Sequence, residues 1–133
     1  MKSTIYGSDW PTIRRTIKMM TLAQRLSMKS TYEKYKIGAV IARKGQVIGV
    51  GFNRHKTHTQ SPHAYKYLHA EVDAALGVPL KQLRGATIYV YREKKDGTYG
   101  LAKPCSSCEG FLKERGLKSM IYTSDNGMLM ELL

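Results

Sequence analysis

Two short segments of this chain carry side chains that suit metal-assisted chemistry. The first holds His69 and Glu71, and the second holds Cys105 and Cys108 in the pattern Pro-Cys-x-x-Cys. Imidazole and thiolate are ligands that Zn²⁺ prefers, and three protein ligands leave the fourth tetrahedral position for water. Zn²⁺ lowers the pKa of such a water toward neutrality. We therefore predict a catalytic zinc centre with His69, Cys105 and Cys108 as its ligands.

Glu71 is the candidate catalytic residue beside this metal. It lies two residues after His69 on a short helix that the sequence predicts over 67–76, before Gly77. In an ideal helix the side chains of His69 and Glu71 diverge by about 200°, so both cannot bind one metal from the middle of the helix. At the first turn, His69 can reach the metal while Glu71 reaches over the bound water. Its expected role is to accept and return protons.

Other interpretations of the cysteine pair are a redox motif and half of a structural zinc site. A thioredoxin-like motif would follow a strand in a βαβ unit, without Pro104 and without a distant His-x-Glu. A structural disulfide is not expected, because nothing in the sequence suggests export. The N-terminus lacks the apolar block of a signal peptide, and no run of about 18 apolar residues occurs. We therefore expect a cytoplasmic protein without a membrane span.

The 133 residues are enough for a single domain, 1–133, with its own core. Lys44-Gly45 predicts a hairpin between two strands, and Asp125-Asn126-Gly127 predicts that the last strand returns antiparallel. A second turn signal near Asp96-Gly97 predicts a small hairpin after the preceding strand. The predicted order is helix, strand, strand, helix, strand, helix, strand, strand, over 9–29, 37–43, 46–53, 67–76, 85–92, 105–115, 117–123 and 128–133.

The net charge of the whole chain is +12, and the positive charge is concentrated in its first half. Residues 10–66 hold twelve Lys or Arg against one acid, whereas 67–133 hold nine against eight. At about 100° per residue, four cations of the first helix share one exposed ridge. This asymmetry favours a polyanionic partner or a phosphorylated substrate, and the alternative is a solvated basic surface. The ridge consists of Arg14, Lys18, Arg25 and Lys29.

A polar loop over 53–66 runs from the hairpin to the His69 segment and should lie near the mouth of the site. It carries Arg54, Lys56 and Tyr65, and cations interleaved with an aromatic ring are typical of single-stranded nucleic-acid binding. Three histidines in the loop raise the alternative of a second metal cluster. We discount it because His69 and the two cysteines already complete one set of ligands.

His69-Ala70-Glu71, followed by Pro104-Cys105-Ser106-Ser107-Cys108, resembles the motifs of the cytidine deaminase superfamily. The expected order of elements matches over nearly the whole chain, while motif identity is confined to the two zinc segments. The resemblance implies a three-layer α/β/α sandwich around a five-stranded mixed sheet. It also implies hydrolytic removal of an exocyclic amine, with Zn²⁺ as cofactor and Glu71 as the proton shuttle.

The resemblance also indicates substrate contacts. Asn53, at the end of the second strand, resembles the Asn that contacts the sugar in this superfamily. Backbone N–H groups of Ala70 and Cys105 are expected to donate to the base, and Pro104 is expected beside it. The loop adds Arg54, Lys56 and Tyr65 as candidate contacts.

The branch of the superfamily is less clearly indicated. His69 as the first ligand resembles deoxycytidylate, tRNA adenosine and polynucleotide cytosine deaminases, whereas small nucleoside deaminases commonly use Cys. An antiparallel last strand resembles the nucleoside deaminase and bacterial toxin branch instead. The segment 93–103 is also longer than the direct link usual in the superfamily.

We expect conversion of cytosine to uracil in a polynucleotide, with single-stranded DNA as the preferred form. A net charge of +11 over 10–66 exceeds what one phosphate requires. The first alternative is a free cytidine nucleotide such as deoxycytidylate. Adenine or guanine as the base, and a non-catalytic zinc module that binds nucleic acid, are further alternatives. Glu71 argues against the last, because a structural zinc site has no use for it.

Overall fold

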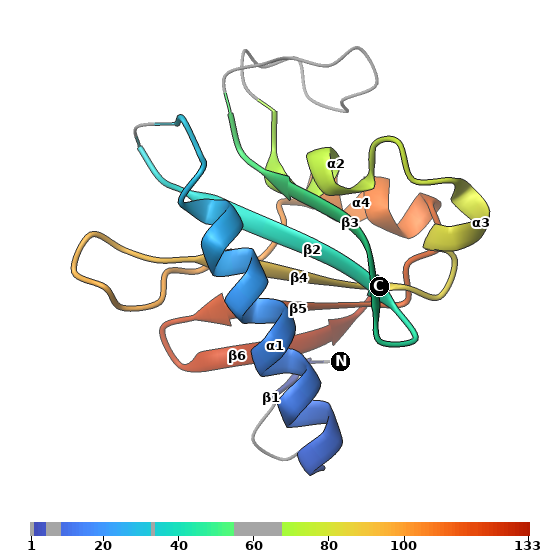
Figure 1. The fold of residues 1–133 in the computed structure, drawn as a ribbon, viewed down its shortest axis with the longest axis horizontal. Coiled ribbons are helices and arrows are strands. Elements are labelled where there is room, and N and C mark those ends of the chain that lie inside the picture. Colours follow the sequence, from blue (N-terminus) through green and yellow to red (C-terminus); the bar gives the residue numbers. More distant parts are fainter. Residues whose placement is uncertain (1, 5–8, 33, 55–67) are drawn as a thin grey trace.

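The computed structural model describes residues 2–4, 9–32, 34–54 and 68–133 (Figure 1). Its centre is a mixed sheet with the strand order β1-β6-β5-β4-β2-β3. Helix α1 covers one face, and the three other helices lie on the opposite face. The elements are β1 (Lys2–Thr4), α1 (Trp10–Ser27), β2 (Ile37–Arg43), β3 (Gln46–Phe52), α2 (Ala70–Ala75), α3 (Leu80–Leu83), β4 (Thr87–Arg92), α4 (Ser106–Glu114), β5 (Ser119–Ser124) and β6 (Gly127–Leu132).

The five strands from β6 to β3 confirm the predicted α/β/α sandwich around a mixed sheet. β4 and β5 are parallel, and the other neighbouring strands are antiparallel. The hairpin of β2 and β3 and the antiparallel β6 were both predicted from their turns. The sequence did not predict β1, a strand of three residues without apolar alternation, or the single turn of α3.

Both faces of the central strands are buried, which explains why they read as continuous apolar runs. Along β2, Ala39 and Ile41 pack under α2 and α4, while Val40 and Ala42 pack under α1. β4 alternates in the same way between the two faces. Within the described residues, no helix has the length and apolar character needed to cross a membrane.

Helix α1 begins at Trp10, within one residue of its predicted start. The Asp9 carboxylate accepts a hydrogen bond from Thr12 N at 2.9 Å, and Pro11 lies in the first turn. The four ridge cations are exposed, as expected. Ile17, although apolar, is 51% exposed. Thr16 faces the sheet instead, because its hydroxyl donates to Thr12 O at 2.9 Å and can be buried without losing its hydrogen bond.

Gly38 allows α1 to lie directly against β2. A Cβ atom at Gly38 would lie 1.9 Å from Ala23 O and 2.7 Å from Ser27 N, both backbone atoms of α1. We therefore expect Gly38→Ala to lower the free energy of unfolding by at least about 2–3 kcal/mol, since the helix itself must move. Gly110→Ala on α4 is the matched control, because its Cβ would meet open space. Urea unfolding measures both, and equal effects would contradict this account.

Candidate active site

The two chemically distinctive segments meet where α2 and α4 begin, on the same face of the sheet. His69 is the N-cap of α2, Cys105 is the N-cap of α4, and Cys108 lies in the first turn of α4. The ligand atoms of these three residues all lie within 4.8 Å of one another, and Cys108 Sγ is 3.3 Å from His69 Nδ1. The structure thus brings together residues that are far apart in the sequence.

Helix α2 is shorter than predicted, and this difference shapes the site. Leu68 exchanges backbone hydrogen bonds with Arg54, at 2.6 and 3.1 Å, so the chain is extended there and cannot be helical. His69 is also extended, with φ −72° and ψ 144°. Because His69 is not helical, its side chain does not diverge from that of Glu71 as it would in an ideal helix. Both side chains line the same cavity.

The three side chains fit one zinc ion. Zinc–ligand bonds of about 2.0–2.3 Å in a tetrahedron separate the ligand atoms by roughly 3.5–3.8 Å. The observed 3.3 Å between Cys108 Sγ and His69 Nδ1 is close to this, and all three ligand atoms lie within 4.8 Å of one another. Burial, and then the negative charges of Glu71 and Cys105, raise the pKa of the Cys108 thiol. A divalent cation reverses this effect and deprotonates a coordinating thiol. The start of α4 also favours thiolate.

Glu71 lies against this set of ligands and is only 5% exposed. Burial raises the pKa of its carboxyl group to about 7, although backbone and Cys108 hydrogen bonds oppose the shift. A carboxyl group with a pKa near neutrality can both accept and return protons under ordinary conditions. The local environment is therefore consistent with the role predicted for Glu71.

A cavity of about 260 Å³ opens at the candidate zinc site. Asn53 lies in the wall of this cavity and is only 1% exposed. This position is consistent with the substrate contact that the family resemblance implied. Its Oδ1 accepts from Ile37 N at 2.9 Å, and its Nδ2 donates to Tyr35 O at 3.0 Å. Asn53 thus joins the end of β3 to the start of β2. An amide nitrogen carries two hydrogens, so one N–H remains for a substrate.

The other predicted substrate contacts have different surroundings. Ala70 lines the cavity, while Pro104 is buried directly before Cys105 and is not among the described lining residues. Arg54 is likewise absent from this lining, because its Nη2 pairs with Asp73 Oδ1 at 2.6 Å. Lys56 and Tyr65 lie outside the described residues. A role in substrate binding stays a prediction for all of these.

Sequence reasoning missed several residues that line the cavity, and those with polar side chains are Tyr35, Arg92 and Lys103. The Arg92 guanidinium lies 5.2 Å from the centre of the Tyr35 ring and donates to Leu101 O at 3.4 Å. Lys103 pairs with Glu131 at 3.1 Å. Lys103 could have been noticed, because it directly precedes the Pro-Cys motif. Nothing in the sequence indicates that Arg92 reaches the same cavity, since this depends on how β4 pairs with β2.

Comparison with known proteins identifies the family. A family model described as the cytidine and deoxycytidylate deaminase zinc-binding region matches residues 13–124. The chain belongs to this family. The matched range thus contains both segments of the candidate zinc site.

Individual relatives and solved structures similar to this chain are named as deaminases of cytidine or deoxycytidylate. The deoxycytidylate deaminase of Mycobacterium phage D29 is 25% identical over 126 residues, which covers 79% of this chain and 91% of that protein. The apo dCMP deaminase of cyanophage S-TIM5 superposes with a TM-score of 0.60 at 21% identity, covering 84% of this chain and 83% of that one. Cytidine deaminase of Burkholderia pseudomallei gives a TM-score of 0.61 at 21% identity over 87% and 91%. Both solved structures share the fold.

Membership of the deaminase family confirms the expected enzyme class and cofactor. The protein is a zinc-dependent hydrolytic deaminase of the cytidine and deoxycytidylate type. His69, Cys105 and Cys108 form its candidate zinc site. A non-catalytic zinc module was therefore a wrong alternative.

Proposed function

We propose that this deaminase converts the cytosine of a phosphorylated cytidine unit to uracil, and that a free nucleotide such as deoxycytidylate is its substrate. The observation that carries the proposal is that one small cavity holds both the candidate catalytic groups and two cations. Glu71 and two candidate zinc ligands line one part of it, while Arg92 and Lys103 add positive charge. Two cations beside the chemical centre suit a substrate that carries a phosphate.

The size of the cavity and the relatives support a free nucleotide. At about 260 Å³ it falls slightly below the usual range for ligand cavities, roughly 300–1000 Å³, so it suits one small ligand. The phage D29 relative is named a deoxycytidylate deaminase, and the cyanophage S-TIM5 enzyme has been solved in complex with dCMP and dUMP.

In the proposed reaction, water adds to the ring carbon that bears the amine, and ammonia leaves. Zn²⁺, when bound, supplies a water whose pKa is lowered toward neutrality. Glu71 takes one proton from the water and passes it to the ring nitrogen, then takes the second proton from the added hydroxyl and passes it to the amine, which departs as ammonia. The free N–H of Asn53 orients the sugar, and the backbone N–H groups of Ala70 and Cys105 hold the base. Arg92 and Lys103 hold the phosphate.

The phosphate contact is tested by comparing two substrates. We expect Arg92→Gln and Lys103→Gln each to raise the KM for deoxycytidylate about tenfold, the effect of losing roughly 1.4 kcal/mol of charge-assisted hydrogen bonding. The KM for deoxycytidine should change little, because it carries no phosphate. Lys95→Gln, an exposed cation in the turn after β4, is the control. An equal rise for both substrates would show that the cations do not act on the phosphate.

Cytosine within single-stranded DNA is the second candidate substrate, favoured by the net charge of +12. The position of Arg14 and Lys18, the first two cations of the ridge, makes this candidate less direct. Arg14 and Lys18 lie near Gly45, in the turn that follows β2, whereas the cavity lies at Ile37, where β2 begins. The ridge also belongs to α1, on the sheet face opposite α2 and α4 (Figure 1). A strand held by Arg14 and Lys18 would have to cross the molecule to reach Glu71.

A further inference from the structure

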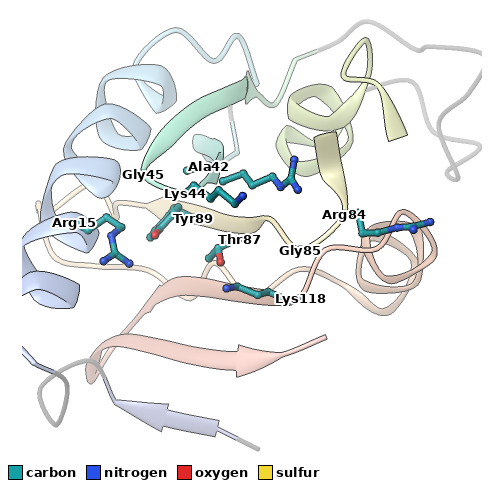
Figure 2. Close-up of a pocket in the computed structure, with 10 residues that line it drawn as sticks. Arg15, Ala42, Lys44, Gly45, Arg84, Gly85, Thr87, Tyr89 and Lys118 are labelled. Carbon is teal, nitrogen blue, oxygen red and sulfur yellow. The ribbon is translucent and has the colours of Figure 1, made fainter. Parts of the chain in front are cut away.

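A second hollow, of about 500 Å³, lies at the other end of the sheet from the active site (Figure 2). Five cations from separate elements surround it, and we call it the distal basic groove. Figure 2 shows Arg15 of α1 on one side, Arg84 on the other, and Lys44 and Lys118 between them. The cations are Arg15, Arg43, Lys44, Arg84 and Lys118.

Among the described residues, no carboxylate forms part of the lining of this groove. None of its five cations forms an ion pair with another described residue. Elsewhere in the described chain, Lys94 and Lys103 each pair with a carboxylate. Five like charges around one hollow create a positive potential that attracts an anionic partner.

The groove continues beyond the first hollow. A neighbouring depression shares Arg15 and Gly45 with it and adds Arg14 and Lys18. One carboxylate, Asp9, lies near this end, where hydrogen bonds from Thr12 and then the charge of Arg15 lower its pKa. The cations therefore extend over both hollows, which meet at Arg15 and Gly45. This distribution suits successive phosphates along a strand, whereas a single phosphate requires donors that converge on one point.

The groove is separate from the catalytic cavity. The two share no described lining residue. β2 connects them, with Ile37 in the cavity and Arg43 in the groove, and its seven residues span roughly 20 Å at about 3.3 Å each. A ligand in the groove would thus bind independently of the residues that carry out deamination.

We propose that the distal basic groove binds the phosphate backbone of a single-stranded nucleic acid. This binding function lies beyond the proposed deamination of a nucleotide and does not depend on which substrate the zinc site accepts. A concave groove favours one flexible strand over a duplex, whose convex surface cannot place its phosphates between Arg15 and Arg84. The backbone contacts carry no base preference, because the described lining offers cations and only one aromatic ring, Tyr89, which is 4% exposed.

The proposal is tested by oligonucleotide binding at several salt concentrations, with a labelled single strand of about 12 nucleotides, within the site sizes known for such grooves. The variant combines Lys44→Asn, Arg84→Gln and Lys118→Gln. Each lost phosphate contact costs about fivefold near 0.1 M salt, so we expect binding about 100-fold weaker and a log–log salt slope reduced by about 2. Asn is used at position 44 because Lys44 has a φ of 53°, which Asn tolerates.

A control variant removes three exposed cations outside the groove through Arg25→Gln, Lys95→Gln and Lys113→Gln. It has the same net charge as the groove variant, and we expect less than about a threefold loss. Melting temperature and zinc content confirm that both variants fold. Lys44→Asn alone, in an exposed turn, should still cost about fivefold.

Three results would overturn the proposal. The first is an equal loss of binding in the control variant, which would show that only net charge matters. The second is binding of a duplex as tight as that of the single strand. The third is displacement of the strand by inorganic triphosphate at an equal phosphate concentration, which would show that the groove takes small anions.

Discussion

The Glu71→Gln variant is expected to lose deaminase activity by a factor of about 10²–10⁴ or more, while it retains its zinc. Gln has nearly the same shape as Glu but cannot take a proton from water or return it to the base. Glu71 is 5% exposed and lies beside the candidate zinc ligands, so no other described carboxylate can replace it in the cavity. Product formation from deoxycytidylate, followed by mass spectrometry, measures the loss.

Glu114→Gln is the matched control for this experiment. It makes the same chemical change at an exposed position near the end of α4, outside the cavity. Its turnover should equal that of the wild type. If Glu71→Gln retained wild-type turnover with a normal zinc content, the assignment of Glu71 as the proton shuttle would be wrong.

Cys108→Ser is expected to lose zinc, activity and stability together. Cys108 is fully buried, and its Sγ lies 3.3 Å from His69 Nδ1. Serine hydroxyl does not ionise readily and is a poor zinc ligand, so we expect zinc affinity to fall by more than about 100-fold, the largest effect usual for a residue that only supports a ligand. Tightly bound zinc stabilises the folded state by about 4 kcal/mol at a concentration 1,000 times its Kd. The variant should lose about 2.7 kcal/mol or more of this stabilisation.

Metal analysis and thermal unfolding, each with and without added zinc, measure these effects. The melting temperature of the wild type should rise with zinc, and that of Cys108→Ser should not. Ser107→Ala changes an exposed residue between the two cysteines and should behave as the wild type does. One zinc per chain in purified Cys108→Ser would rule out Cys108 as a ligand.

The candidate zinc ligands could be identified from sequence because their chemistry is local. A Cys-x-x-Cys at the start of a helix places both sulfurs near its first turn, whatever the rest of the fold does. Turn residues were equally informative, since Asp125-Asn126-Gly127 predicted the antiparallel β6 and Gly127 adopts a φ of 99°. The start of α1 was also predicted to within one residue, and the Asp9 carboxylate caps it.

Features that depend on strand pairing were not predictable in this way. Arg92 reaches the cavity because β4 pairs with β2 in a register that sets Arg92 opposite Ile37. Arg54 was expected at the substrate, but its partner Asp73 comes from α2, which packs against β3. The distal basic groove draws its cations from α1, the end of β2, the turn after β2, the residue after α3 and the residue before β5. No single stretch of sequence shows these charges together.

Product analysis of deoxycytidylate turnover in heavy-oxygen water tests the central claim most directly. The claim is that a zinc site formed by His69, Cys105 and Cys108 delivers water to the amine-bearing carbon while Glu71 moves the protons. The account predicts deoxyuridylate with heavy oxygen at the position of the former amine, released with an equal amount of ammonia. No such product from zinc-loaded enzyme, or a product without the heavy isotope, would contradict it.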